Sequence, residues 1–143
     1  MIYNANSSAA GLAQPADESL VTYTNVIYAL HSLAVLIGVV GAMSVVGSFL
    51  GGLPSIVAVI MNYARRSDVR GTFLDSHFSW QIRTFWYALL WFLVVWAISL
   101  PLMPLFFIGV VPLTLGTLAL GIWIIYRVVR GWVALRDRKP MYV

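Results

Sequence analysis

Two long stretches of the chain, residues 19–64 and 84–126, contain no Asp, Glu, Lys or Arg. One membrane crossing takes about 20 residues of α-helix, at about 1.5 Å per residue. A single helix through either stretch would be roughly 65 Å long, about twice the thickness of the hydrocarbon core. Each stretch therefore predicts two crossings and a tight turn. The fold class that follows is all-α, a polytopic membrane protein with four transmembrane helices arranged as two hairpins.

Glycine and proline residues cluster where the two turns are needed, because glycine permits positive φ and proline removes a backbone donor. The clusters are Gly47, Gly51, Gly52 and Pro54 in the first stretch, and Pro101, Pro104, Gly109 and Pro112 in the second. We place the spans near Asn25–Val46, Leu53–Ala64, Thr84–Leu100 and Ile108–Val129. The second span is short for a crossing, so three full spans with a re-entrant segment remain an alternative to four.

The polar segment between the two stretches has helical periodicity. Thr72 followed by Asp75 resembles a capping box. Leu74, Phe78 and Ile82 then recur at a spacing of four residues, which places them on one helix face. We expect this interfacial segment to form an amphipathic helix that lies in the headgroup layer and runs into the third transmembrane helix.

These patterns divide the chain into three parts. Residues 1–21 are expected to form a flexible polar tail, residues 22–132 the four-helix transmembrane domain, and residues 133–143 a basic C-terminal tail. The first 20 residues contain no Lys or Arg and no early apolar core. A cleavable signal peptide requires both, so we expect the first helix to serve as the insertion signal and to be retained.

Composition supports the membrane assignment. Of the 143 residues, 61% are hydrophobic and 10% are charged, against about 45–50% and about 25% in soluble domains. The mean hydropathy is +0.88. This composition excludes a soluble enzyme, a disordered regulator and a nucleic-acid module. The chain has no cysteine, which excludes disulfides, thiolate metal sites and a cysteine nucleophile.

The positive charge predicts the orientation. The net charge is +4, and the nine Lys and Arg residues lie in two segments that flank the apolar stretches. These residues are Arg65, Arg66, Arg70, Arg83, Arg127, Arg130, Arg136, Arg138 and Lys139. Basic segments stay on the cytoplasmic side, so four spans predict cytoplasmic N- and C-termini in a bacterial inner membrane. With three spans, the N-terminus lies outside. The charge also predicts anionic lipid headgroups as partners, and no nucleic acid.

Small residues are spaced to allow close helix packing. They lie at Ala34, Gly38, Ala42, Gly47 and Gly51, at spacings near four residues. Such stripes let helix backbones approach in lipid. We favour packing within the four-helix bundle, and a docking face for another subunit is the alternative.

His31 is the titratable side chain inside the first apolar stretch, and an ionisable group there suggests a functional site. Haem ligation, a proton relay and a hydrogen bond to a quinone are the candidate roles. Haem ligation or relay work needs a partner, and the expected spans contain no carboxylate and no second histidine. We therefore favour a neutral histidine that is hydrogen-bonded to a neighbouring helix, and we predict no cofactor and no metal.

Further polar residues lie at the membrane boundary. Asp75 and His77 are two residues apart, which places them on different helix faces and disfavours a metal site or an acid–base pair. We expect His77, Gln81 and Arg83 to bind headgroups or backbone. Arg127 and Arg130 share a helix face and could clamp a phosphate. With His31, these residues form the expected lipid- or ligand-binding set, and none is assigned a catalytic role.

Two segments resemble a known family. They are Ser76-His-Phe-Ser-Trp-Gln-Ile-Arg-Thr-Phe-Trp86 and Tyr126-Arg-Val-Val-Arg-Gly-Trp132, the latter followed by Lys139-Pro-Met141. The chain resembles the small bacterial inner-membrane proteins of unknown function that are distantly similar to an inner-envelope translocon component of chloroplasts. The resemblance covers roughly residues 23–141. It implies a four-helix inner-membrane protein with a charged, amphipathic loop before the third helix, and it assigns no catalytic residues.

Three function classes follow. The leading hypothesis is a non-catalytic integral membrane protein that acts as an accessory or assembly subunit of a larger membrane complex, or as a homo-oligomer. The first alternative is a small transporter, channel or translocon-like component, lined by Asn25, His31, Asn62, Ser99, Thr114 and Thr117. The second is an enzyme acting on lipid or quinone at the cytoplasmic interface through Asp75, His77 and Arg83.

Overall fold

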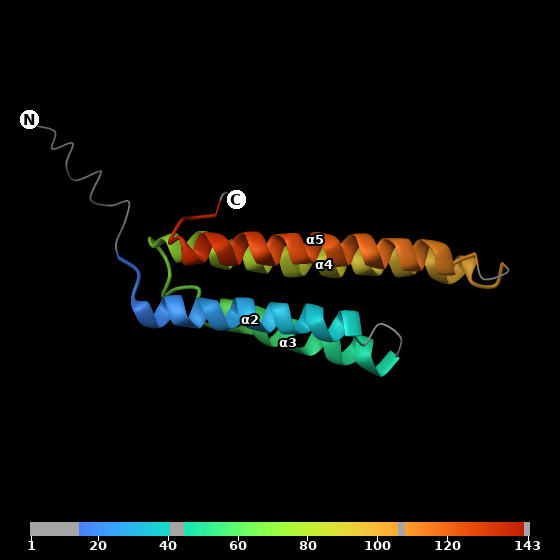
Figure 1. Cartoon of the computed structure of the whole chain (residues 1–143), viewed down its shortest axis with the longest axis horizontal. Coiled ribbons are helices and arrows are strands. Elements are labelled where there is room, and N and C mark those ends of the chain that lie inside the picture. The colour runs from blue at the N-terminus through green and yellow to red at the C-terminus, as the bar shows by residue number, and fades with distance from the viewer. Residues whose placement is uncertain (1–14, 41–44, 106–107, 142–143) are drawn as a thin grey trace, which may run out of the picture.

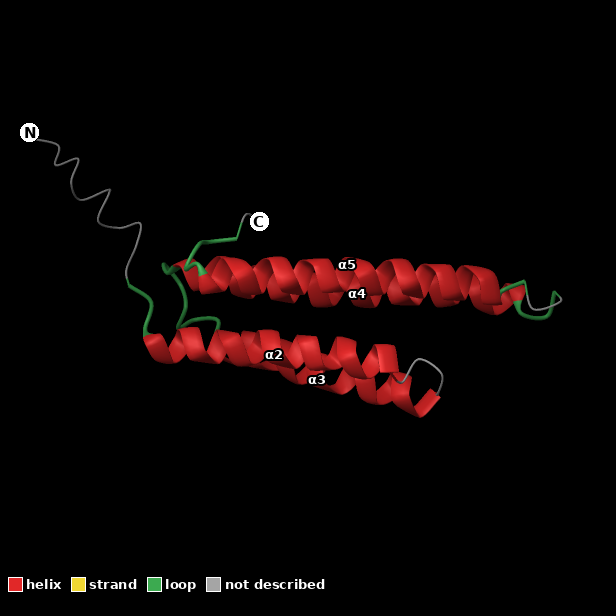
Figure 2. Ribbon diagram, viewed as in Figure 1, coloured by secondary structure: helices red, strands yellow, loops and turns green. Residues whose placement is uncertain are grey.

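The structure, a computed structural model, describes residues 15–40, 45–105 and 108–141, and it describes no side chains for residues 39–51. The described part of the chain is helical (Figures 1 and 2). Its helices are α2 (Glu18–Val40), α3 (Val45–Ala64), α4 (Phe73–Leu102) and α5 (Val110–Arg136).

The helices are arranged as two antiparallel pairs. Helix α2 packs along α3, and α4 packs along α5, with further contacts from α2 to both α4 and α5. Helices α4 and α5, of 30 and 27 residues, extend beyond the far ends of α2 and α3 (Figure 1). The start of α2, the end of α5 and the connection from α3 to α4 all lie at the opposite end of the molecule.

The helix starts follow local capping rules. Asp17 precedes α2, and its carboxylate accepts a hydrogen bond from the Ser19 backbone N–H at 2.9 Å. The Thr72 hydroxyl accepts from the Leu74 N–H at 3.2 Å and caps α4, as its sequence position predicts. Between α3 and α4, Gly71 has a φ of +78°, a backbone conformation that glycine adopts without strain.

The expected amphipathic helix does run into the third span. Residues 73–83 form the first three turns of α4. Leu74, Phe78 and Ile82 do share a buried face, so the predicted periodicity is correct. That face packs into the protein core, which offers the apolar row a better-packed environment than a lipid surface.

The turn expected at Gly47–Pro54, in the first apolar stretch, is misplaced. Helix α3 begins at Val45, so residues 47–54, including Pro54, lie inside it. In a membrane environment, neighbouring helices and local adjustments let proline and glycine remain within a helix. Helix α2 ends at Val40 and α3 begins at Val45, and residues 41–44 lie outside the described part of the chain.

The boundaries of the three expected parts shift in the same way. Helix α2 starts at Glu18, inside the segment assigned to the N-terminal tail, and α5 continues to Arg136, inside the segment assigned to the C-terminal tail. In the second cluster, Pro101 lies in the last turn of α4 and Pro112 in the first turn of α5, and Pro104 and Gly109 lie between the two helices. The turn expected there is present.

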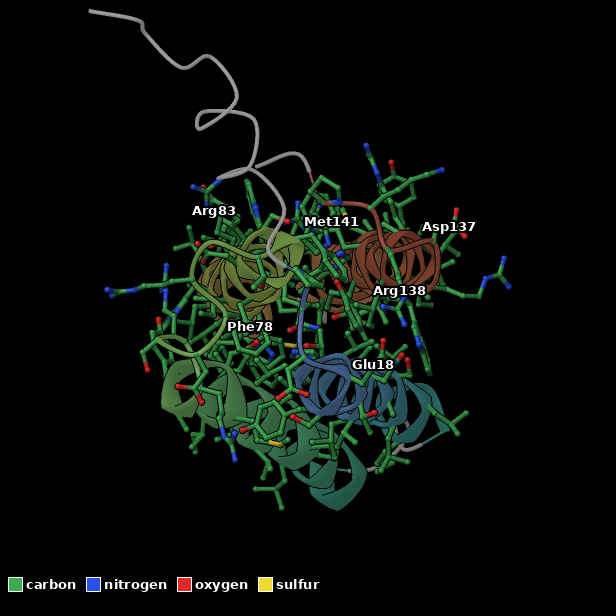
Figure 3. The ribbon with its side chains drawn as sticks, turned by 90° about the vertical axis from the view of Figure 1, so that its left-hand side faces the viewer. Glu18, Phe78, Arg83, Asp137, Arg138 and Met141 are labelled. Atoms are coloured by element: carbon green, nitrogen blue, oxygen red, sulfur yellow. The ribbon has the colours of Figure 1, made fainter. Side chains whose placement is uncertain are left out.

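The charged side chains gather at one end of the molecule. Figure 3 looks onto this end, where Glu18, Arg83, Asp137 and Arg138 surround the helix ends. We call it the charged end. The largest fully buried side chains, led by Tyr28 and Phe78, also lie in the core near this end. The two helix pairs therefore pack against each other at the charged end. In the far halves of α4 and α5, the rest of the chain buries few side chains.

Three helices are long and apolar enough to cross a membrane among the described residues. They span Glu18–Gly38, Phe73–Leu102 and Val110–Arg136. The described apolar part of α3, Gly52–Ala64, is shorter than one crossing. The chain thus has the character of a membrane protein.

Candidate functional site

His77 links three segments of the chain near the charged end. Its Nε2 lies 2.8 Å from the Lys139 carbonyl oxygen, and its Nδ1 lies 2.9 Å from the Tyr28 hydroxyl. A carbonyl only accepts, so Nε2 carries the proton and donates, and the unprotonated Nδ1 accepts from Tyr28. The neutral imidazole thus satisfies both contacts, which makes His77 a buried structural connector between α2, α4 and the C-terminal segment.

The C-terminal segment folds back on the start of α4. The Met141 backbone N–H donates to the Ser76 hydroxyl at 2.9 Å, and the Met141 side chain is buried. Asp137 follows α5 directly, and Arg138 has a φ of 52°, a left-handed conformation that reverses the chain direction. The expected basic C-terminal tail is thus attached to α4 through residues 139–141.

Arg127 stacks on an aromatic ring at the interface of α4 and α5. Its Cζ lies 3.6 Å from the centroid of the Trp80 ring, and its Nε donates to the Thr84 hydroxyl at 2.7 Å. The Trp80 indole N–H donates to the Arg127 carbonyl at 3.1 Å. Cation–π contact and these hydrogen bonds hold the guanidinium against α4. No described carboxylate pairs with it, so its charge is balanced by dipoles and the ring face.

Two buried polar side chains lie around a small internal cavity next to Arg127. The cavity volume is about 10 Å³, close to the smallest volume that holds one water molecule. His31 donates or accepts at Nδ1 with the Ser55 hydroxyl at 3.2 Å, while its Nε2 has no partner among the described residues. Neither amide atom of Gln81 has one.

The remaining predicted residues lie apart from this cavity. Arg83 is exposed on α4. Arg130 is exposed on α5, where its guanidinium donates to the Tyr126 hydroxyl at 2.7 Å. Arg127 and Arg130 both approach the Trp80 ring, with Arg130 5.7 Å from its centroid. The structure therefore brings His31, Gln81 and Arg127 together around one cavity, with His77 one hydrogen bond away through Tyr28.

The expected stripe of small residues is described only in part. Ala34 is buried, whereas no described atom lies within 4 Å of a Cβ built on Gly38. Ala42 lies outside the described residues, and Gly47 and Gly51 lie within α3, where no side-chain surroundings are described. Close approaches occur instead at Gly116, next to the Val95 side chain, and at Gly131, next to the Tyr28 ring.

Sequence reasoning missed Tyr28, which is 1% exposed. It binds His77, and its ring stacks on Trp132 with an interplanar angle of 11°. Its position three residues before His31 on the same helix was the available signal, because residues three apart share a face. Asn62 was noted as a pore candidate, but its full burial in α3 without a described partner was not foreseen.

The described residues contain no group of three or more His, Cys, Asp and Glu side chains that could hold a metal ion. Asp75 and His77 lie on the same turn of α4. Both ring nitrogens of His77 are nevertheless hydrogen-bonded to other groups, the Tyr28 hydroxyl and the Lys139 carbonyl. These site residues can bind polar groups and anions and can hold the helices in register.

Comparison with known protein families, curated proteins and solved structures gives no significant match to this chain.

Proposed function

We propose that the chain is a non-catalytic integral protein of a bacterial inner membrane that serves as an accessory or assembly subunit of a larger membrane complex, or as a homo-oligomer. Its fold would cross the membrane four times as two hairpins, as in the family that the sequence resembles. The charged end would face the cytoplasm because it holds the basic residues of the described chain.

One exposed helix face carries this proposal. Large apolar side chains recur on α5 at alternating spacings of four and three residues, and each is at least 43% exposed. They are Val111, Leu115, Leu118, Ile122, Ile125 and Val129, which we call the α5 stripe. This spacing is the heptad pattern of helices that pack at about 20°.

Packing of knobs into holes stabilises helix pairs in lipid through van der Waals contact. Between Val111 and Val129, Tyr126 is the one large exposed apolar side chain outside the stripe. Small or polar residues, among them Thr114, Thr117 and Ala119, occupy the neighbouring exposed positions. A face on which large and small side chains alternate favours a docked helix, from a partner subunit or from a second copy of this chain.

A photo-crosslinking amino acid at Ile122 tests the proposal in intact membranes. We expect a discrete protein adduct at this position, either with a different subunit or with a second copy. The matched control is Leu90, which lies on α4, is 53% exposed and sits at a similar distance from the charged end.

Alanine at Leu115, Leu118 and Ile122 together is expected to abolish the adduct formed from a probe at Ile125. The same number of substitutions on α4, at Leu89, Leu90 and Leu93, should leave it intact. A chain that stays monomeric and yields no protein adduct at Ile122, or equal adducts at Ile122 and Leu90, would contradict the proposed role.

A second candidate is a small transporter or channel, because the buried polar atoms of His31, Asn62 and Gln81 lack described partners. Polar groups of this kind inside a membrane protein often mark a path for ions or solutes. The cavity beside His31 holds one water at most, so a path would need a second conformation or an oligomer. Solute or proton flux into proteoliposomes that is lost in His31→Ala would favour this candidate over the first.

A further inference from the structure

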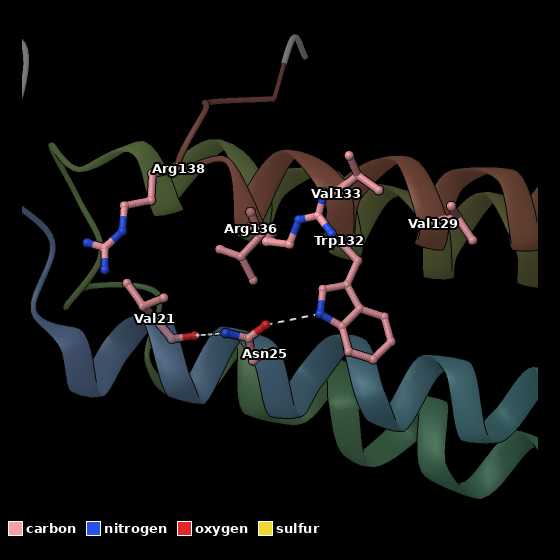
Figure 4. Close-up of a pocket in the computed structure, with 8 residues that line it drawn as sticks. Val21, Asn25, Val129, Trp132, Val133, Arg136 and Arg138 are labelled. Carbon is pink, nitrogen blue, oxygen red and sulfur yellow. Dashed lines mark hydrogen bonds between the residues drawn. The ribbon is translucent and has the colours of Figure 1, made fainter.

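A groove lies between α2 and α5 at the charged end. Its volume is about 580 Å³, within the range of small-molecule sites. Figure 4 shows the residues that line it. They are Val21 and Asn25 from α2, and Val129, Trp132, Val133, Leu135, Arg136 and Arg138 from α5 and the segment after it.

The polarity of the groove changes along its length. Arg138 lies at the charged end, Arg136 lies between it and Trp132, and Val133 and Val129 follow along α5 toward the far end of the helix (Figure 4). One end is therefore cationic and the other aliphatic. An amphiphile with an anionic head and an apolar chain has the same order of groups.

The base of the groove is fixed by hydrogen bonds. The Trp132 indole N–H donates to the Asn25 side-chain oxygen at 3.0 Å, and the Asn25 amide donates to the Val21 carbonyl at 3.1 Å. The Trp132 ring also stacks on Tyr28. These contacts span the space between α2 and α5 and make the groove a preformed feature, so a ligand would not bear the cost of ordering it.

Both arginines remain available to an anion. Arg136 is 81% exposed in its side chain, and the nearest carboxylate oxygen, on Asp137, is 3.9 Å from its Nε, beyond hydrogen-bond distance. Arg138 pairs with Glu18, and both side chains are more than half exposed. Exposed ion pairs contribute little to stability, so a phosphate can replace the Glu18 carboxylate at Arg138.

We propose that this groove binds one anionic phospholipid from the surrounding bilayer. The phosphate contacts Arg136 and Arg138, and one acyl chain lies along Val133 and Val129 beside the Trp132 ring. The site goes beyond the proposed subunit role because it lies between α2 and α5 and does not include the central residues of the α5 stripe.

Photoactivatable phosphatidylglycerol with a diazirine on its acyl chain tests the site with the full chain in nanodiscs of phosphatidylcholine. We expect labelled peptides from residues 129–133, and competition by unlabelled phosphatidylglycerol but not by phosphatidylcholine with the same acyl chains. Arg136→Gln combined with Arg138→Gln should weaken the competition roughly five- to twenty-five-fold, since each basic residue near an anionic surface contributes about fivefold. Arg65→Gln with Arg66→Gln is the matched control, because these arginines lie at the charged end outside the groove.

Two further variants separate binding from folding. Glu18→Gln removes the carboxylate that competes at Arg138 and should strengthen phosphatidylglycerol binding roughly twofold or more, an effect that loss of folding does not produce. Val133→Trp fills the aliphatic end and should reduce labelling, whereas Leu90→Trp, outside both the groove and the α5 stripe, should not. Equal competition by the two lipids, or equal losses in the Arg65/Arg66 control, would overturn the proposal.

Discussion

Individual side chains at the charged end are fixed by complementary donors and acceptors. His77 Nε2 donates to a carbonyl, and in the neutral imidazole its Nδ1 accepts from the Tyr28 hydroxyl. Arg127 has no described carboxylate partner and is held by the Trp80 ring and the Thr84 hydroxyl. Each group is satisfied by residues from another segment, so the loss of one partner leaves a buried polar atom exposed to an apolar environment.

Tyr28→Phe removes one hydroxyl and leaves Nδ1 of His77 without a donor. We expect a loss of about 1–3 kcal/mol in the free energy of unfolding, the usual cost of an unsatisfied buried polar atom. Unfolding in detergent micelles followed by circular dichroism measures it. Tyr126→Phe is the control, because its hydroxyl binds the exposed Arg130, and it should change stability by less than about 0.5 kcal/mol. Equal stabilities of the two variants would rule out a connecting role for His77.

At the scale of helices, α4 and α5 approach each other closely at Gly116, which has no side chain to hold them apart. A Cβ built on Gly116 would lie 2.6 Å from a methyl carbon of Val95, closer than two carbon atoms can pack. The valine side chain is branched at Cβ and has one strongly preferred rotamer in a helix. Gly116 therefore sets the distance between these two helices in the part of the pair that the rest of the chain leaves uncovered.

Gly116→Ala is expected to push α4 and α5 apart and to cost about 1–3 kcal/mol, as overpacking does in other well-packed interfaces. Gly121→Ala on the same helix has no described atom within 4 Å of the new methyl group. It should be neutral or stabilising by up to about 1 kcal/mol, because alanine is the better helix former. Thermal unfolding of both variants in the same detergent gives the comparison, and a loss in Gly121→Ala as large as that in Gly116→Ala would show that the contact with Val95 is not the cause.

At the scale of the whole molecule, charge and core packing coincide at one end, and apolar exposed surface dominates the other. The exposed residues on the far halves of α4 and α5 are large and hydrophobic, from Trp91 to Ile122. Lipid or a partner helix must cover them, because a soluble monomer rarely exposes so much continuous apolar surface. In the proposed arrangement, the charged end would lie at one membrane surface and the far ends of α4 and α5 would lie at the other.

Single cysteines test this arrangement without background, since the chain has none. A membrane-impermeant maleimide applied to intact cells and to inverted vesicles should label Ser67→Cys and Asp137→Cys from the same side. Leu105→Cys, next to the connection from α4 to α5, should be labelled from the opposite side. Ser44→Cys lies outside the described residues and should label with Leu105 if α2 and α3 cross the membrane as a pair. Labelling of positions 67 and 137 from opposite sides would disprove the common orientation of the charged end.

Whether the role of a residue can be predicted from the sequence depends on how far apart in the chain the residue and its contacts lie. The Thr72 cap and the row Leu74, Phe78 and Ile82 follow from contacts within one or two helical turns, and the structure confirms them. The turn expected at Gly47–Pro54 was wrong because glycine and proline do not end a helix that its surroundings stabilise. The roles of Tyr28 and Gly131 depend on contacts between residues far apart in the chain.

The sequence by itself determined that the protein is helical, apolar along two long stretches and basic at their boundaries, because hydrophobic periodicity and charge placement act locally. Only the tertiary structure decided which faces meet. It placed His77 between Tyr28 and Lys139, Arg127 on Trp80, and the arginines of the C-terminal segment at one end of an apolar groove. The physical reason is that these contacts join different helices, and their geometry depends on how whole helices pack.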